Sequence, residues 1–207
     1  VLNERPQPIL TLKDDDLFLL TDTFGNIGGS HDDGRSSGLG LFCQDTRFLN
    51  RLELQIDGRP PMLLSSTAEK GFVLSVLCTN PRFTDQIPAE TIGIKRELVL
   101  NGGLFEEIEV SNYSTETVQF EMSLSFDADF IDLFEVRGFH RTERGRLLRR
   151  LPHEPEEIES FVAIDEMERA PTEMVMAYQG LDGTILESRI DFIHRQPDLL
   201  KGYTALW

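Results

Sequence analysis

The sequence is poor in several residue types that specialised folds and sites require. Its 207 residues include 2 cysteines, 4 histidines, 1 tryptophan and 3 tyrosines. Two cysteines cannot form a disulfide framework, and neither cysteine nor histidine occurs at the ligand spacing of a zinc site. With no Gly-x-Ser-x-Gly motif, Ser-His-Asp catalysis also has little support. Scarce Trp and Tyr, the usual platforms for sugar rings, weaken the case for an autonomous carbohydrate-binding module.

Positive charge and long apolar runs are also scarce. The 20 Lys and Arg residues oppose 36 Asp and Glu residues, which gives a formal net charge of −16. Such a domain repels a phosphate backbone, whereas a neutral ligand such as a sugar is unaffected. No apolar run approaches the roughly 20 residues that a membrane span needs, and no signal peptide opens the sequence. We therefore expect neither a nucleic-acid partner nor a membrane partner.

The cysteines, Cys43 and Cys78, lie in apolar, strand-like stretches where a free thiol behaves as a small hydrophobe. We expect buried, reduced thiols, with a single bridge between neighbouring strands as the alternative. Reduced thiols favour a cytoplasmic location. The sequence begins at Val1 and ends at Trp207 within an apolar alternation, so we expect residues 1–207 to be one domain cut from a longer polypeptide.

Apolar and polar residues alternate through most of the sequence, a pattern typical of strands with one buried face. The candidate strands are 17–21, 48–56, 62–66, 72–78, 92–100, 104–110, 118–126, 161–164, 174–179 and 185–193. Asn and Gly at the turns near 101–103 and 112–115 predict a three-stranded antiparallel meander over 92–126. Because no helix of about ten or more residues is evident, we predict an all-β fold, an antiparallel β-sandwich.

Three segments have the composition of loops. Residues 25–40 are rich in glycine but lack the spacing and the strand-to-helix context of a phosphate-binding loop. Residues 137–150 are basic, and residues 154–168 are acidic. We interpret these two as solvated faces of a long loop, with pairing between them or docking of a neighbour as the alternative.

The segment 126–138 places three aspartates, a glutamate and an arginine among three phenylalanines. Its charged residues are Asp127, Asp129, Asp132, Glu135 and Arg137. Such acids cost free energy if they lose water without a partner, so a core strand would not carry them without a reason. A calcium loop would need glycine at its sixth position and glutamate at its twelfth, and both are missing, so we predict no metal. We expect the acids to accept hydrogen bonds from backbone amides or to pair with Arg137 in a semi-buried cluster.

A second informative segment, 40–49, reads Gly-Leu-Phe-Cys-Gln-Asp-Thr-Arg-Phe-Leu and offers Asp45 and Arg47 as a similar couple. Together with the Phe-Asp-Ala-Asp-Phe block that begins at 126, it resembles the N-terminal domain of bacterial glycogen debranching enzymes (amylo-α-1,6-glucosidases). Shorter pieces, from Leu17 to the Tyr-Gln-Gly-Leu-Asp-Gly run at 178–183, follow in the same order, so the resemblance covers most of the chain.

This resemblance implies a β-sandwich of the supersandwich type, placed before an (α/α)6 toroid that carries the glycosidase acids. The chain itself would be non-catalytic and without a cofactor, and its partners would be that catalytic domain and an α-glucan. A glycosidase site needs two carboxylates that flank the scissile bond, and the sequence identifies no such pair here. The expected interdomain or substrate contacts are Asp45, Arg47, Asp127, Asp129, Asp132, Glu135 and Arg137. The alternative is a stand-alone oligosaccharide-binding or interaction module without an enzyme role.

Overall fold

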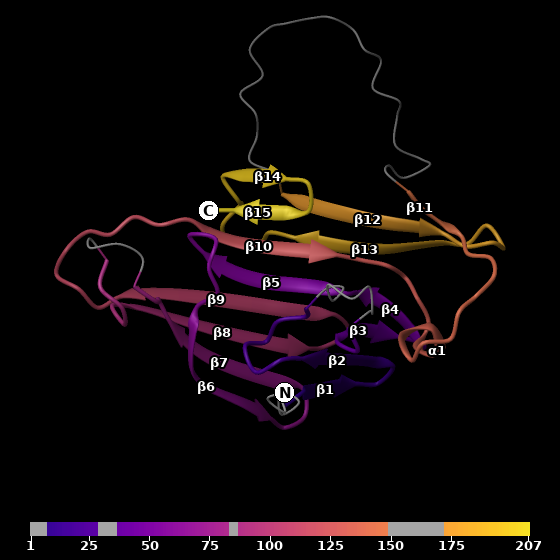
Figure 1. Ribbon diagram of the computed structural model, residues 1–207, viewed down its shortest axis with the longest axis horizontal. Coiled ribbons are helices and arrows are strands. Elements are labelled where there is room, and N and C mark those ends of the chain that lie inside the picture. Colours follow the sequence, from indigo (N-terminus) through magenta and orange to yellow (C-terminus); the bar gives the residue numbers. More distant parts are fainter. Residues whose placement is uncertain (1–7, 29–36, 83–86, 149–171) are drawn as a thin grey trace, which may run out of the picture.

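The computed structural model describes residues 8–28, 37–82, 87–148 and 172–207 (Figure 1). Nearly all the regular structure in these ranges is β, and every strand pairing within the sheets is antiparallel. The strands divide among four sheets in a propeller-like arrangement, which does not specifically indicate a sandwich. The all-β, antiparallel prediction is therefore confirmed. No helix in these ranges is long and apolar enough to cross a membrane.

Consecutive hairpins form the first sheet, in the order β1-β2-β3-β4. Its strands are β1 (Leu10–Asp14), β2 (Leu17–Thr21), β3 (Gly40–Cys43) and β4 (Thr46–Leu49). The predicted strand 17–21 is confirmed as β2. Gln44 and Asp45, between β3 and β4, have φ values of 46° and 64°, and positive φ at both central residues is what a tight hairpin turn requires.

A four-stranded meander forms the second sheet, in the order β6-β7-β8-β9. Its strands are β6 (Met62–Glu69), β7 (Val73–Thr79), β8 (Ile92–Leu100) and β9 (Leu104–Asn112). The candidate strands at 62–66, 72–78, 92–100 and 104–110 are all found here. Alternation places Ile92, Ile94, Leu98 and Leu100 on one face of β8, and all four are buried. Alternation thus located both the strands and their inner face.

The third sheet corrects one prediction. Its order is β14-β15-β10-β5, with β14 (Leu199–Lys201), β15 (Thr204–Leu206), β10 (Met122–Asp127) and β5 (Arg51–Ile56). β10 therefore pairs with β5 and β15 and not with β9, so the third strand of the predicted meander was wrong. Val118 and Phe120 precede the strand but still pack on the core. Alternation fixes which face of a strand is buried, but it does not identify the partner strand.

The fourth sheet, in the order β11-β12-β13, packs near the third (Figure 1). Its strands are β11 (Arg146–Leu148), β12 (Glu173–Gln179) and β13 (Ile185–Asp191). The candidate strands at 174–179 and 185–193 correspond to β12 and β13, whereas 161–164 lies outside the described residues. The predicted strand 48–56 is divided between two sheets, with the break at the buried Asn50.

A buried hydrophobic cluster draws side chains from all four sheets, including Leu19 of β2, Leu54 of β5, Leu98 of β8 and Met176 of β12. Each such side chain, once fully buried, contributes about 1.5–3 kcal/mol to folding. Cys78 belongs to this cluster, and Cys43 is half-buried. Both thiols are free, which agrees with the expectation of reduced cysteines.

Arg96 lies on the inner face of β8 among these apolar residues, with 1% of its side chain exposed. Its Nε is 2.7 Å from a carboxylate oxygen of Glu106. Its Nη1 donates to the carbonyl oxygen of Phe24 at 2.8 Å and to Oδ1 of Asn26 at 2.6 Å. These bonds offset the cost of burying the guanidinium group and fasten the turn after β2 to β8.

Asp22 stabilises the same turn through hydrogen bonds to its backbone, and the pKa of its carboxyl group allows this packing to be tested. Its Oδ1 accepts the amides of Phe24 and Asn26, both at 2.8 Å. Burial nevertheless raises the pKa of the Asp22 carboxyl above its ordinary value of 3.8, against the effect of these two hydrogen bonds.

We expect the stability difference between wild type and Asp22→Asn to depend on pH. The folded state binds the Asp22 proton more tightly than the unfolded chain, and asparagine keeps both accepted hydrogen bonds. From about pH 3.8 upward, the unfolding free energy of wild type should therefore fall relative to that of the variant. Urea denaturation across pH 3 to 7 measures this difference, and a rise with pH would show that the fold stabilises the carboxylate instead.

Candidate functional site

An ion pair between a buried arginine and a partly exposed aspartate joins the two segments that the sequence singled out. The Arg47 side chain of β4 is 0% exposed, and it contacts Asp129 through Nε–Oδ1 at 3.1 Å and Nη2–Oδ2 at 2.5 Å. This two-pronged geometry matches the planar guanidinium group to the carboxylate. Nη1 also donates to the carbonyl oxygens of Ser37 and Leu39. Arg47 thus fastens the approach to β3 to the segment after β10.

The predicted couple of Asp45 with Arg47 was therefore wrong. Asp45 is exposed in the β3–β4 turn, and its carbonyl oxygen accepts the amide of Leu133 at 3.0 Å. The buried Arg47 side chain packs against Gly40. A Cβ at position 40 would lie 2.5 Å from Cδ of Arg47, so a larger residue there would displace the arginine. The Gly-Leu-Phe start of this segment therefore leaves space for the arginine that follows it.

Phe130, next to the ion pair, has an unusual backbone conformation. Its φ is 51°, in the left-handed region that a bulky side chain rarely adopts. The ring is buried, stacks on Tyr178 at a centroid distance of 5.7 Å and meets Phe48 edge-on. Asp129 is held by Arg47 on one side, and the Arg47 amide donates to the carbonyl oxygen of Ile131 on the other. Strain of this kind persists only where the surroundings hold it, and it is common at ligand sites.

A short helix, α1 (Leu133–Val136), follows Phe130 at the end of the molecule near β4 (Figure 1). Asp132 caps it and accepts the amides of Phe134 and Glu135 at 2.8 and 2.9 Å. Glu135 reaches back to the amide of Asp132, which completes a capping box. Asp132 and Asp127 accept backbone amides, as the sequence predicted; the donor to Asp127 is the amide of Ala128.

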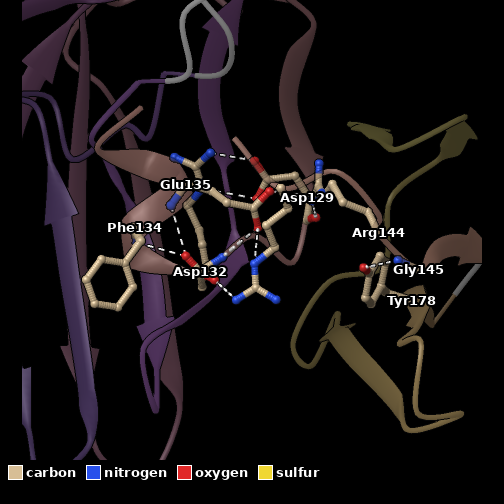
Figure 2. Close-up of polar contacts among 9 residues, drawn as sticks. Asp129, Asp132, Phe134, Glu135, Arg144, Gly145 and Tyr178 are labelled. Carbon is tan, nitrogen blue, oxygen red and sulfur yellow. Dashed lines mark hydrogen bonds and ion pairs between the residues drawn. The ribbon is translucent and has the colours of Figure 1, made fainter. Parts of the chain in front are cut away.

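Arginines from the segment between α1 and β11 neutralise this pair of acids. Arg141 pairs with Asp132 and Glu135, and Arg144 lies 3.3 Å from Glu135 and donates to the carbonyl oxygen of Asp129 (Figure 2). Burial alone would raise the pKa of Asp132. Hydrogen bonds from the Glu135 amide and from Arg141 outweigh it, so the pKa lies below its ordinary value of 3.8.

The predicted pairing of Arg137 with the acids of this segment was wrong. Arg137 is exposed at the end of α1, and it makes no ion pair within the described residues. Its expected partners are held instead by Arg47 and Arg141. The basic run was interpreted as a solvated face, yet Arg141 and Arg144 fold back onto the preceding acids. The acidic run at 154–168 lies outside the described residues.

A cleft of about 300 Å³, which we call the Tyr178 cleft, opens beside these ion pairs. Its lining includes Asp132, the stacked rings of Phe130 and Tyr178, and Leu181 and Asp182 of the β12–β13 turn. Figure 2 shows Tyr178 on the far side of the ion pairs from Phe134. The amide of Gly145 donates to the Tyr178 hydroxyl at 2.7 Å.

Charge in the Tyr178 cleft is mixed but mainly negative. Four carboxylates line it with two guanidinium groups, those of Arg141 and Arg144. Among the described residues, no three His, Cys, Asp or Glu side chains are placed to hold a metal ion. The arrangement suits a neutral, hydrogen-bonding ligand better than an anion or a metal.

The comparison with protein families finds one match over nearly the whole chain. The model of the N-terminal domain of some glycogen debranching enzymes covers residues 12–207. The chain belongs to this family. Neither the curated proteins nor the solved structures contain a match.

The sequence did not reveal the part of the Tyr178 cleft that comes from residues after α1. The sequence analysis placed Tyr178 in the candidate strand 174–179 and gave the 178–183 run as part of the resemblance, but it assigned no site role to Tyr178, Leu181 or Asp182. Glu143 was only an acid within the basic run. Nothing in the sequence indicates that Tyr178 of β12 stacks on Phe130, because that contact depends on how separate sheets pack. Of the seven predicted contacts, only Asp132 and Glu135 line the cleft.

We expect Arg137→Ala to change the stability of this domain by less than about 0.5 kcal/mol, because the exposed side chain makes no ion pair with the described residues. Chemical denaturation of wild type and variant measures the change. A loss of about 2 kcal/mol or more would show that Arg137 does compensate a buried carboxylate.

Proposed function

We propose that this chain is the non-catalytic N-terminal domain of an α-1,6-glucosidase that debranches glycogen-like glucans. The family match over residues 12–207 carries this proposal. On this proposal residues 1–207 form one domain of a longer cytoplasmic enzyme, with the four sheets as a supersandwich placed against an (α/α)6 catalytic domain. The domain shapes one wall of the substrate cleft and contacts α-glucan.

The chemistry of the two acids in the capping box of α1 supports a non-catalytic role for the cleft. A glycosidase needs one carboxylic acid that stays protonated near neutral pH, which requires a raised pKa. Asp132 has the opposite property, because its hydrogen bonds and Arg141 favour the carboxylate. Glu135 beside it is flanked by Arg141 and Arg144. Such a pair is suited to hold a loop or a ligand and not to protonate a leaving group.

Exposed residues at the end of α1 support an interdomain contact. Phe134 and Phe139 are 66% and 68% exposed, and the amide of Phe139 donates to the carbonyl oxygen of Phe134. Arg137 lies between them in the sequence and has no ion pair among the described residues. Aromatic and arginine side chains are the residue types most enriched at protein interfaces. We assign this surface, with Asp45 beside it, to the contact with the catalytic domain.

The proposal predicts that the 207-residue chain releases no glucose from glycogen limit dextrin, whereas the parent enzyme does. It also predicts that Arg137→Ala lowers the activity of the parent enzyme while the isolated domain keeps its stability. A coupled glucose assay on purified proteins measures both.

Release of glucose by the isolated chain, lost on replacing one of its acids, would place the active site here and contradict the proposal. The alternative, a stand-alone oligosaccharide-binding module, predicts instead that the gene encodes no helical catalytic domain after this one.

A further inference from the structure

We infer that the Tyr178 cleft is a binding subsite for an α-1,4-linked glucose unit of the glucan. The inference takes the identity of the sugar from the proposed function; the location and the chemistry of the site come from the cleft itself. Its volume of about 300 Å³ is at the lower end of the range of small-ligand pockets.

Unused hydrogen-bonding groups face this cleft. The Tyr178 hydroxyl accepts the Gly145 amide, so its own proton is available to a ligand oxygen. Glu143 lines the cleft and makes no hydrogen bond or ion pair with any described residue. A carboxylate with free lone pairs accepts hydrogen bonds from sugar hydroxyls, and a phenolic proton donates to them. The cleft therefore offers the donors and acceptors that a polyhydroxylated ligand needs.

The electrostatics of the cleft select against other ligands of this size. Carboxylates outnumber guanidinium groups in its lining, so a phosphorylated sugar or a nucleotide would meet repulsion. The described acids are not arranged as a metal site. Leu181, which is 68% exposed at the rim, supplies an apolar contact for the carbon face of a sugar ring. A neutral sugar is not repelled by the carboxylates, needs no metal ion and has an apolar carbon face for Leu181.

The walls of the cleft are held in place before any ligand arrives. Phe130, in its strained backbone conformation, stacks on Tyr178 and so fixes the ring. A Cβ at Gly145 would lie 1.9 Å from the carbonyl oxygen of Gln179, so only glycine lets this segment approach β12. Preorganised walls lower the entropic cost of binding.

Titration of the 207-residue chain with maltotetraose, followed by amide NMR, tests the inference. We expect saturable shifts at the amides of Gly145 and Gly180, which line the cleft, and no shift at Gly93 on β8. Tyr178→Phe and Glu143→Gln should each weaken binding by about fivefold or more, because the first removes a hydrogen-bond donor to the ligand and the second replaces a charged acceptor with a weaker neutral one. Glucose 1-phosphate, as an anion, should not produce the shifts.

Tyr203→Phe and Glu107→Gln are the matched controls, since they make the same changes at exposed positions outside the cleft lining. Shifts that saturate elsewhere, or binding that both cleft variants leave unchanged, would overturn the inference and leave the proposed function intact. Absence of any maltotetraose binding, with the parent enzyme still active, would also overturn the inference alone. Hydrolysis by the isolated chain would contradict the proposed function instead.

Discussion

The ion pair between the buried Arg47 and Asp129 is the constraint on which the rest of this region depends. A guanidinium group with no exposed surface costs free energy unless every donor finds an acceptor, and Arg47 meets this demand with a carboxylate and two carbonyl oxygens. Those acceptors belong to two segments, the approach to β3 and the chain after β10. The pair therefore fixes the chain after β10 relative to β3 and β4, and Gly40 provides the space for it.

The ion pair has consequences for the functional surface. With Asp129 fixed, Phe130 is held in a strained conformation against Tyr178, and Asp132 is placed to cap α1. Arg141 and Arg144 then fold over Asp132 and Glu135, which closes the segment that borders the Tyr178 cleft. One charged pair inside the domain thus orients both proposed surfaces, the exposed end of α1 and the cleft.

Much of this fold follows from the sequence, because alternation with turn residues is a local signal. It located β2 and β6 to β9 and the buried face of β8. It failed where the outcome depends on distant partners: β10 pairs with β5 and β15, and Arg47 pairs with Asp129 and not with the nearby Asp45. The charged residues of 126–138 marked an important segment, yet the sequence could not show which arginines would reach them. A cleft built from different sheets, with Tyr178 stacked on Phe130, has no local signature in the sequence.

A double-mutant cycle on Arg47→Ala and Asp129→Ala tests the central claim most directly, with unfolding free energies from urea denaturation as the measurement. Asp129→Ala should cost about 3 kcal/mol or more, because it leaves the fully buried Arg47 guanidinium group without its carboxylate. Arg47→Ala should also destabilise the fold, because it leaves the partly exposed Asp129 carboxylate without its partner. The double variant should cost much less than the sum, with a coupling energy of about 1.5 kcal/mol or more. The exposed pair of Arg51 and Glu53 should give less than about 1 kcal/mol in the same cycle. Additive losses at Arg47 and Asp129 would contradict the account, since the pair could not then be what holds this region together.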